Sequence, residues 1–432
     1  MVVKVNSVLR EVLLEKNVPK EEMKEIKIKL DKFLVDVRKA AKSLKVKVDV
    51  FVGGSYAKKT MIKKGDYDID IFMRFDKGYE EKEFSILVKK ILDKVKGIRP
   101  VVIHGSRDYF RVNSSDNLFF EIIPVKKVNN PKDAENITDL SYSHVKYVNR
   151  KVKSQKILDE IKIAKAFCYA KKCYGAESYI KGFSGYGLEL LVYHCGSFMK
   201  FAREILKVDS KKRWVIDLEK HYRNRNLILM DLNESKLKSP IVLIDPTFKT
   251  RNVLAALSEE TLEKFKSGIR NFLKNPSIKD FRLEEIDFNE AERKAKGKKQ
   301  DFIFVRIGTV KQEGDIAGSK LLKFYNHLKS EVERFFDVKD CGFEYPGEGQ
   351  SGRFFLSVKK RGDILVGGPD LKDEKNVKRF EEGHKITFKK GKRIYAREKV
   401  DFSLKDFFNK WEKKNVKKVG EMSVSGLEVS EG

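Results

Sequence analysis

The chain has 432 residues, which is enough for two to four domains that each bury a core of their own. A hydrophobic fraction of 41% is typical of a globular protein. The sequence contains no run of about 18 apolar residues that could cross a membrane and no apolar segment typical of a secretory signal. We therefore expect a cytoplasmic protein with no membrane partner.

The charge is strongly unbalanced. Lysine and arginine number 92 against 64 aspartates and glutamates, so the net charge is +28. A basic excess of this size attracts polyanions, and the phosphates of nucleic acid bind such surfaces with release of counterions. Adaptation to heat would explain many charges of both signs, but not the imbalance. The composition favours a nucleic acid partner.

The cysteines predict neither a metal site nor disulfide bonds. They form no Cys-x-x-Cys pair and have no histidines at zinc spacing, so we interpret them as reduced packing residues. The four are Cys168, Cys173, Cys195 and Cys341.

The first part of the chain alternates between helical and strand patterns. Apolar residues at three- and four-residue steps predict helices, and alternation or short apolar runs predict strands. The expected helices are residues 19–44 and 80–97, and the expected strands are residues 46–52, 67–75, 99–104, 108–113 and 118–126. This pattern predicts a mixed-sheet domain over residues 1–138.

The remainder of the chain divides into two parts. Residues 139–288 are dominated by long helical patterns and predict a largely helical central domain. Residues 289–300 are polar and without periodicity, which predicts a linker or long loop. Strands and a helix follow, so residues 289–432 form an expected C-terminal α/β domain that ends in a loose tail. The predicted fold class is a multidomain α+β protein.

Two aspartates stand close together in the strand YDIDIFMRF. Residues two apart on a strand project from the same face, so Asp68 and Asp70 point together while Ile69 and Ile71 face the core. Carboxylates this close repel each other unless one is protonated or a cation lies between them. Mg²⁺ is a natural occupant, because it binds one or two carboxylates and completes its shell with water and phosphates.

Two further features extend this motif. Gly54 and Ser55 form a turn that suits phosphate, because glycine allows close approach of the backbone and the serine hydroxyl can donate a hydrogen bond. Glu121 is the lone acid in the apolar strand LFFEIIPVKK and can supply a third ligand. Each feature alone is common in loops and on solvated strands, whereas the combination predicts metal-dependent phosphate chemistry.

These residues carry a family resemblance. The Gly-Ser turn, the D-x-D strand and the later strand acid resemble the polymerase-beta-like nucleotidyltransferase superfamily. Within it, nearly the whole chain is similar to the archaeal class I CCA-adding enzymes, the tRNA nucleotidyltransferases. The segments that carry this similarity are KCYGAES (172–178), KGFSGYGLELLV (181–192), DPTFKTRNVLAAL (245–257) and GPDLKDEKNVKRF (368–380).

The resemblance implies an activity, partners and a cofactor. It implies template-independent addition and repair of CCA at tRNA 3′ ends from CTP and ATP, with Mg²⁺ and release of pyrophosphate. The C-terminal domain is expected to bind the acceptor and T arms of tRNA, and phenylalanines of its strands could contact RNA or form a core. Dimers occur in the family, so the resemblance allows a homodimer.

The resemblance also implies roles for individual residues. Two Mg²⁺ ions are expected on Asp68, Asp70 and Glu121. The incoming nucleotide is expected to contact Ser55, Lys58, His144, Lys165, Tyr174 and Arg251, of which Arg251 reads the base.

Two of these residues depart from the family pattern. Glu121 replaces an aspartate, and its extra methylene moves the carboxylate by about 1 Å, a displacement that can matter to rate. Lys58 replaces an arginine and would bind phosphate as a point charge. From the residues alone, Lys58 and Lys165 could equally be surface lysines, Tyr174 a packing residue and Arg251 a ligand of a nearby acid.

Alternatives to full CCA addition remain open at this point. The chain could add only A or only CC, could tail other RNAs as a poly(A) polymerase does, or could bind tRNA with a decayed site. A catalytic role for Tyr193, His194 and Cys195 is rejected, because their apolar helix brings no matched set of nucleophile, base and acid. We expect these three to pack in the core.

Overall fold

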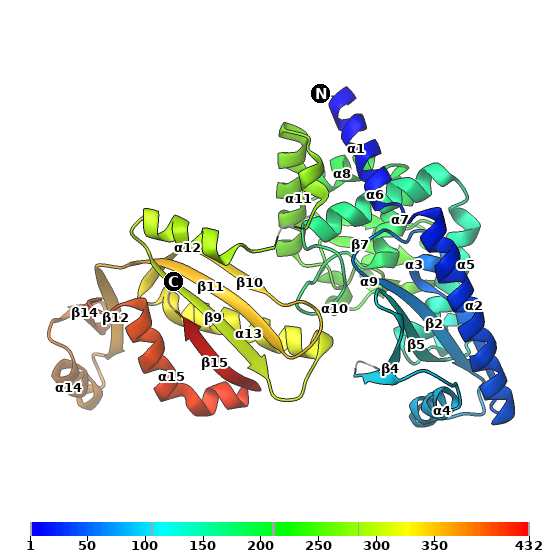
Figure 1. The fold of residues 1–432 in the computed structure, drawn as a ribbon. Helices are drawn as coiled ribbons and strands as arrows, with labels where there is room; N and C mark the ends of the chain where they lie inside the picture. Colours follow the sequence, from blue (N-terminus) through cyan, green and yellow to red (C-terminus); the bar gives the residue numbers. More distant parts are fainter. Residues whose placement is uncertain (1, 105–106, 210–211, 284, 431–432) are drawn as a thin grey trace. The chain divides into compact units, whose positions relative to one another are not determined.

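The computed structural model describes residues 2–104, 107–209, 212–283 and 285–430. The chain separates into two compact units, residues 1–284 and 285–432 (Figure 1). The first unit contains both the mixed-sheet and the helical region, so the boundary at residue 138 stays a prediction. Among the described residues, no helix combines the length and the apolar character needed to cross a membrane.

A five-stranded mixed sheet forms the first part of unit 1. Its strand order is β1-β2-β5-β4-β3, in which β2 and β5 are parallel and the other neighbours are antiparallel. The strands are β1 (Val48–Val52), β2 (Tyr67–Phe75), β3 (Pro100–Ile103), β4 (Tyr109–Ser115) and β5 (Leu118–Lys126). The predicted N-terminal mixed sheet is confirmed.

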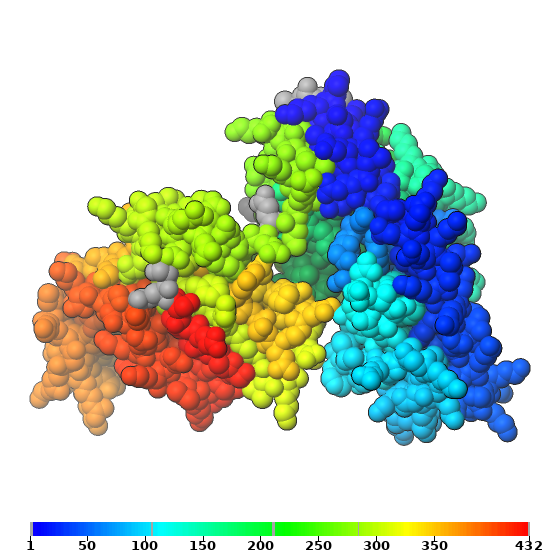
Figure 2. Space-filling view, in the orientation of Figure 1, coloured from blue at the N-terminus to red at the C-terminus, as the bar shows by residue number. Residues whose placement is uncertain are grey.

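Two helices cover one face of this sheet, α2 (Lys20–Ser43) and α4 (Glu81–Asp93) (Figure 1). Apolar residues at helical spacing, such as Leu30 and Phe33, pack against Ile69, Ile71 and Phe120 of the central strands. The outer faces of both helices lie at the molecular surface (Figure 2). Because strand side chains alternate, the other face of the sheet remains for polar residues.

The rest of unit 1 is largely helical, as predicted. Its core includes a cluster of phenylalanines around Phe167, and α1 packs against this core rather than against the sheet. The helices are α1 (Val2–Lys16), α3 (Gly54–Ala57), η1 (Pro131–Asp133), η2 (Ile137–Leu140), α5 (Ser141–Lys151), α6 (Gln155–Ala170), α7 (Gly185–Cys195), α8 (Phe198–Lys207), α9 (Arg225–Asp231), α10 (Glu234–Leu237), α11 (Glu259–Lys274) and η3 (Ile278–Phe281).

A small sheet lies within this helical region. Strand β6 runs parallel to β7, and β7 runs antiparallel to β8. The strands are β6 (Trp214–Ile216), β7 (Ile241–Asp245) and β8 (Phe248–Asn252), and every residue of β7 is buried. The hairpin of β7 and β8 holds charged residues in a buried setting.

Unit 2 contains two sheets. One is four-stranded with the order β10-β11-β9-β15, and the other is three-stranded with the order β12-β14-β13. The elements are α12 (Phe288–Gly297), β9 (Asp301–Thr309), α13 (Gly314–Glu333), β10 (Phe336–Glu344), β11 (Ser351–Lys360), β12 (Asp363–Asp370), α14 (Glu374–Gly383), β13 (Thr387–Lys390), β14 (Arg393–Lys399), α15 (Leu404–Glu421) and β15 (Val424–Ser430). The predicted C-terminal α/β region is confirmed.

The predicted linker at residues 289–300 is wrong, because most of it forms α12. The side chain of Asp287 accepts a hydrogen bond from the backbone N–H of Glu290 and caps the helix. Glu290 pairs with Lys294 at a distance of 2.6 Å, and Ala295 is buried. A cap and an i,i+4 ion pair support this polar helix, and Phe288 at its start packs on Phe304 of β9.

The predicted loose tail is also wrong. Residues 424–430 form β15, which pairs antiparallel with β9, and Val424 is buried. Pairing with a distant strand supplies the backbone hydrogen bonds that the local sequence does not predict.

The C-terminal phenylalanines contribute to a core. Phe354 and Phe355 on β11 are buried, and Phe302 of β9 stacks on Phe355 with ring centroids 5.5 Å apart. Of the two roles considered for these rings, the structure supports packing for Phe354 and Phe355.

Replacement of Phe167 tests the helical core. Phe167 is fully buried and its ring lies 5.2 Å from that of Phe265 and 5.3 Å from that of Phe281. Phe167→Ala is expected to lower the free energy of unfolding by about 3–5 kcal/mol, measured by urea denaturation, because it leaves a cavity. Leu14→Ala on the exposed side of α1 is the control and should stay within about 0.5 kcal/mol of the wild type. Equal losses in the two variants would contradict the central position of Phe167.

Candidate active site

Two neighbouring strands build an acidic face on the sheet. Asp68 and Asp70 lie on one side of β2, and Ile69 and Ile71 are fully buried on the other side. The parallel register of β2 and β5 pairs the Cα of Asp70 with that of Glu121. The three acids predicted from the sequence therefore project from the same face of the sheet.

Basic side chains form ion pairs with the carboxylates of Asp68 and Glu121. Lys64 Nζ lies 2.6 Å from Asp68 Oδ2, and Arg111 Nη2 on β4 lies 2.9 Å from Glu121 Oε1. Burial, and then the charge of Glu121, raises the pKa of the Asp70 carboxyl to about 7. The pKa of Glu121 is also raised, mainly by burial. The acidic face carries more negative charge than its surroundings compensate.

The donor set has the chemistry of a site for a hard divalent cation. All three acids offer carboxylate oxygens, and a cation would offset both the burial and the repulsion by Glu121 that raise the pKa of Asp70. In the part of the chain that the structure describes, no three His, Cys, Asp or Glu side chains are arranged as a group that could hold a metal ion. Lys64 and Arg111 pair with Asp68 and Glu121, so a bound cation would share these carboxylates with the two basic side chains.

The predicted phosphate turn lies against the acidic face. The backbone N–H of Gly53 donates to the carbonyl oxygen of Asp70 at 2.8 Å, and Ser55 follows in the short helix α3. Gly54 has a φ of +57°, and a Cβ at this position would lie 1.7 Å from Asp70 Oδ2. A residue with a side chain at position 54 would collide with the central carboxylate, so the turn requires glycine.

Two lysines predicted to bind nucleotide share one buried carboxylate. Lys58 Nζ lies 2.7 Å from Glu189 Oε2, and Lys165 Nζ lies 2.9 Å from Glu189 Oε1. Thr60 donates its hydroxyl to Glu189 at 2.7 Å and accepts a hydrogen bond from Lys165 at 2.8 Å. The surface-lysine alternative is wrong for both residues, since Lys58 is 8% exposed and Lys165 is 2% exposed.

This lysine pair carries an excess positive charge. Burial opposes ionisation of Glu189, but the charges of Lys165 and Lys58 outweigh it and lower the pKa of the carboxyl to about 2. Burial lowers the pKa of the Lys165 ammonium, which Glu189 counteracts. One carboxylate faces two ammonium groups, so an anion such as phosphate would complete the charge balance.

A second buried acid joins His144 to Arg251. His144 Nε2 lies 3.0 Å and Arg251 Nη1 lies 2.7 Å from Asp245 Oδ2. The backbone N–H and the hydroxyl of Thr247 each donate to the other oxygen at 2.8 Å. The ring of Tyr186 stacks on His144 with centroids 4.1 Å apart.

Burial and the neighbouring groups act in opposite directions on the ionisation of His144 and Asp245. Burial lowers the pKa of the His144 imidazole, although Asp245 acts in the opposite direction. Burial opposes ionisation of Asp245, but the hydrogen bond to His144 and the charge of Arg251 lower the pKa of its carboxyl. Arg251 lies on β8 and not at a helix N-terminus, and Asp245 holds its guanidinium group in place.

Tyr174 belongs to an aromatic pair. Its ring stacks on that of Tyr169 with centroids 4.2 Å apart. Its hydroxyl oxygen lies 2.6 Å from where a Cβ of Gly185 would be, so the glycine at the start of α7 makes room for it. The packing interpretation of Tyr174 is supported, and its predicted contact with triphosphate stays a prediction.

The sequence analysis missed the two acids that organise these pairs, Glu189 and Asp245. Glu189 is a lone acid in the apolar run GLELLV, which is the same signal that identified Glu121 in its strand. Asp245 ends the apolar run IVLID. Lone acids in apolar runs were therefore a sufficient signal for both residues.

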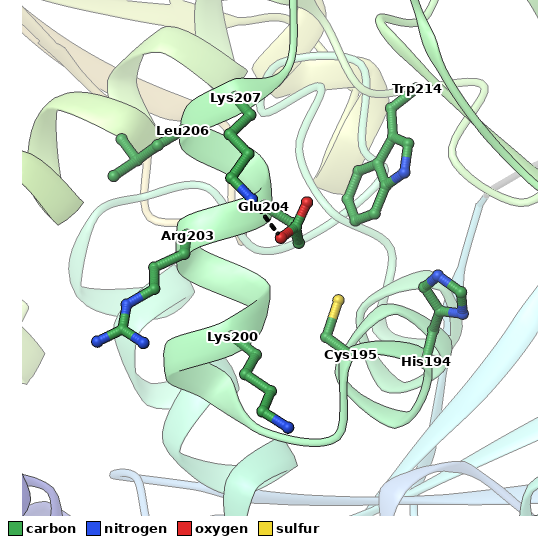
Figure 3. Close-up of a pocket in the computed structure, with 8 residues that line it drawn as sticks. All are labelled: His194, Cys195, Lys200, Arg203, Glu204, Leu206, Lys207 and Trp214. Carbon is green, nitrogen blue, oxygen red and sulfur yellow. Dashed lines mark hydrogen bonds and ion pairs between the residues drawn. The ribbon is translucent and has the colours of Figure 1, made fainter.

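The predicted core packing of residues 193–195 is only partly correct. Tyr193 and Cys195 are partly buried against the helical core, whereas His194 is exposed. His194 and Cys195 line a cavity of about 590 Å³ together with Trp214 and residues of α8, including Glu204, which pairs with Lys207 (Figure 3). This cavity contains none of the predicted site residues.

Two protein-family profiles match unit 1. Residues 34–138 match a nucleotidyltransferase domain, and residues 159–282 match the second domain of tRNA nucleotidyltransferases. The three acids and Lys58 fall in the first range, and Lys165 falls in the second.

Curated relatives extend this result. The CCA-adding enzyme of Nanoarchaeum equitans is 39% identical over 240 residues, which are 56% of this chain and 58% of that enzyme. That of Methanocaldococcus jannaschii is 32% identical over 301 residues, 66% of this chain and 64% of that enzyme. Over these ranges, the chain is similar to the archaeal CCA-adding enzymes. A third such enzyme, from Saccharolobus solfataricus, is 28% identical over 67% of this chain and 65% of its own length, so the chain spans less than two thirds of each of these three relatives.

A solved structure of a cytoplasmic RNA terminal U-transferase is a more distant neighbour. It is 13% identical, has a TM-score of 0.49 and covers 66% of this chain and 99% of that chain. Similarity at this level carries no conclusion beyond that drawn from the CCA-adding enzymes.

Replacement of Glu189 tests the charge balance of the buried lysine pair. Glu189→Gln leaves Lys58 and Lys165 buried without a counter-charge. The free energy of unfolding is expected to fall by about 3–5 kcal/mol in chemical denaturation at neutral pH. Glu204→Gln, which breaks the more exposed pair with Lys207, is the matched control and should change stability by at most about 1 kcal/mol. A wild-type value for Glu189→Gln would show that the buried carboxylate does not hold the lysines.

Proposed function

We propose that this chain adds and repairs CCA at the 3′ ends of tRNA, with CTP and ATP as substrates and Mg²⁺ as cofactor. The observation that carries the proposal is the acidic face of β2 and β5 beside a buried pair of lysines with excess positive charge, in a homologue of CCA-adding enzymes. The basic excess of the whole chain suits a tRNA partner.

The acids of the sheet have the role of metal ligands in this proposal. Asp68, Asp70 and Glu121 hold the cations, which when bound help to deprotonate the RNA 3′-hydroxyl and neutralise the triphosphate. Asp70 must lose its proton to take part, because burial and Glu121 raise the pKa of its carboxyl to about 7. Mg²⁺ is favoured over softer ions because every donor is an oxygen.

The buried pairs have the role of nucleotide ligands. Lys58 and Lys165 bind the triphosphate, for which their unbalanced charge is suited, and Ser55 contributes its hydroxyl. Arg251 presents the N–H groups that Asp245 does not use to the polar edge of the base, beside His144. Tyr174 is the last of the proposed nucleotide ligands. Its hydroxyl group lies next to Gly185, the first residue of α7.

Nucleotide incorporation tests the reaction. We expect labelled CTP and ATP to extend a tRNA that lacks CCA by three nucleotides, and a tRNA ending in CC by one A. A tRNA ending in CCA should not be extended. Extension beyond CCA would favour a poly(A)-type enzyme, addition of only one kind of nucleotide would favour an A-adding or CC-adding enzyme, and no incorporation would favour a tRNA-binding protein.

Replacement of Asp70 links the reaction to the acidic face. Asp70→Asn is expected to reduce incorporation by at least about a hundredfold while tRNA binding is retained, because it removes the central metal ligand. Asp66→Asn is the matched control, since Asp66 is an exposed aspartate in the same segment. Turnover by Asp70→Asn at the wild-type rate would refute the metal role of this face.

Thermal melting with and without Mg²⁺ tests metal binding without catalysis. The ion should raise the melting temperature more at pH 8 than at pH 6, because the Asp70 carboxyl, with a pKa of about 7, is mostly protonated at the lower pH. Asp70→Asn should abolish the response at both values. An equal response at pH 6 and pH 8 would contradict ionisation of Asp70 on binding.

The unit 2 region is proposed to bind the acceptor and T arms of tRNA, as the resemblance implies. A homodimer and a cytoplasmic location likewise stay predictions.

A further inference from the structure

The three-stranded sheet of unit 2 buries one of its faces under a helix. Ile394 and Ala396 of β14 are buried. A Cβ at Gly368 would lie 2.7 Å from Ile394 and 2.9 Å from Phe380 of α14, so this helix packs against their face (Figure 1). Because strand side chains alternate, Tyr395, which stands between the two buried residues, projects from the opposite face.

The opposite face has an apolar and aromatic centre. The register pairs Tyr395 with Phe388 of β13 on one side and with Gly367 of β12 on the other. The rings of Phe388 and Tyr395 are stacked, with centroids 6.0 Å apart and an angle of 23° between the ring planes. Leu365 is 54% exposed and Ile386, just before β13, is 59% exposed. We call this side of the sheet the aromatic face. Large apolar side chains that gather on a solvated surface indicate a binding site.

Basic side chains surround this centre. Arg393 and Arg397 lie two residues on either side of Tyr395, and so share its face. Lys390 lies two residues after Phe388 and shares that face as well. All three basic residues are exposed, and within the described ranges none of them forms an ion pair with an acid. Their charges are available to an anionic ligand.

The aromatic face carries an excess of positive charge. At the two ends of β12, the register pairs Asp363 with Lys399 and Asp370 with Arg393. The carboxylate of Asp370 also accepts a hydrogen bond from the backbone N–H of Lys372. The face thus combines two acids with four basic residues. A second copy of this chain would bring like charges together here, whereas the phosphates of a nucleic acid complement them.

We propose that the aromatic face of β12, β13 and β14 binds unpaired nucleotides of RNA. Phe388 and Tyr395 stack on the bases, since every base has a π-face, and the basic residues around them pair with the adjacent phosphates. Bases inside a double helix are already stacked on their neighbours, so a loop or a single-stranded end suits this face better than a helical stem. The inference names a contact for the RNA partner of the proposed function and rests on that function.

Two labelled RNAs test this site in the full chain without catalysis. One is a blunt-ended hairpin with an unpaired loop, and the other is a blunt duplex of the same length. Tyr395→Leu is expected to weaken binding of the hairpin roughly 5- to 100-fold in fluorescence anisotropy and to leave binding of the duplex unchanged. Tyr395→Phe keeps the ring and should bind the hairpin as the wild type does. Equal melting temperatures of the two variants establish that the sheet is intact.

Two arginine variants test the charge of the face. Arg397→Gln removes a cation from the aromatic face, and Arg379→Gln removes an exposed one from α14, the helix on the other side of the sheet. The slope of log Kd for the hairpin against log salt concentration should fall by about 1 in Arg397→Gln and stay at the wild-type value in Arg379→Gln. Equal slopes in the two variants would contradict a phosphate contact on the aromatic face.

Other results would overturn the inference. Wild-type binding of the hairpin by Tyr395→Leu would do so, and so would equal weakening of the hairpin and the duplex. A chain that sediments as a dimer without RNA and becomes a monomer on Tyr395→Leu would assign the face to a second copy instead. A chain that binds the hairpin through Tyr395 but incorporates no nucleotide would uphold this site and refute the proposed reaction.

Discussion

The electrostatic repulsion between Asp70 and Glu121 is the constraint on which the arrangement of unit 1 depends. The parallel register of β2 and β5 fixes these carboxylates side by side at a partly buried position. Burial removes the water that would screen them, so the surrounding structure must supply positive charge. Arg111, Lys64 and Lys58 supply part of it, while burial and then the charge of Glu121 still raise the pKa of the Asp70 carboxyl. A divalent cation suits the charge that remains.

On the helical side of unit 1, the uncompensated charge has the opposite sign to that on the sheet. There the excess is positive, because among the described residues one carboxylate, that of Glu189, forms ion pairs with both Lys58 and Lys165. A negative excess on the sheet and a positive excess on the helices are complementary to a cation and a polyphosphate bound together. The acids Glu189 and Asp245 are positioning residues in this arrangement, since each fixes two basic side chains that the family resemblance associates with the nucleotide. The proposed chemistry thus depends on charges that a bound cation and polyphosphate would balance.

Sequence reasoning succeeded where a signal was local. The strand pattern of residues 67–75 identified the core side and the acidic side of β2 correctly, because strand side chains alternate regardless of context. It failed for α12 and β15. Helix α12 depends on the Asp287 cap and on i,i+4 ion pairs, which a search for apolar periodicity does not detect. Strand β15 depends on pairing with β9, more than a hundred residues earlier in the chain.

The sequence by itself determined the donor chemistry: two aspartates at strand spacing, a third acid in an apolar run, a glycine turn and a basic excess. It also carried the family resemblance that the comparisons with archaeal CCA-adding enzymes support. Only the tertiary structure decided that Lys58 and Lys165 are buried on one carboxylate, and that Phe388 and Tyr395 stack on a solvated face of the small sheet. The reason is physical: residue type and spacing fix what a side chain can bind, whereas burial and partners depend on contacts between distant segments.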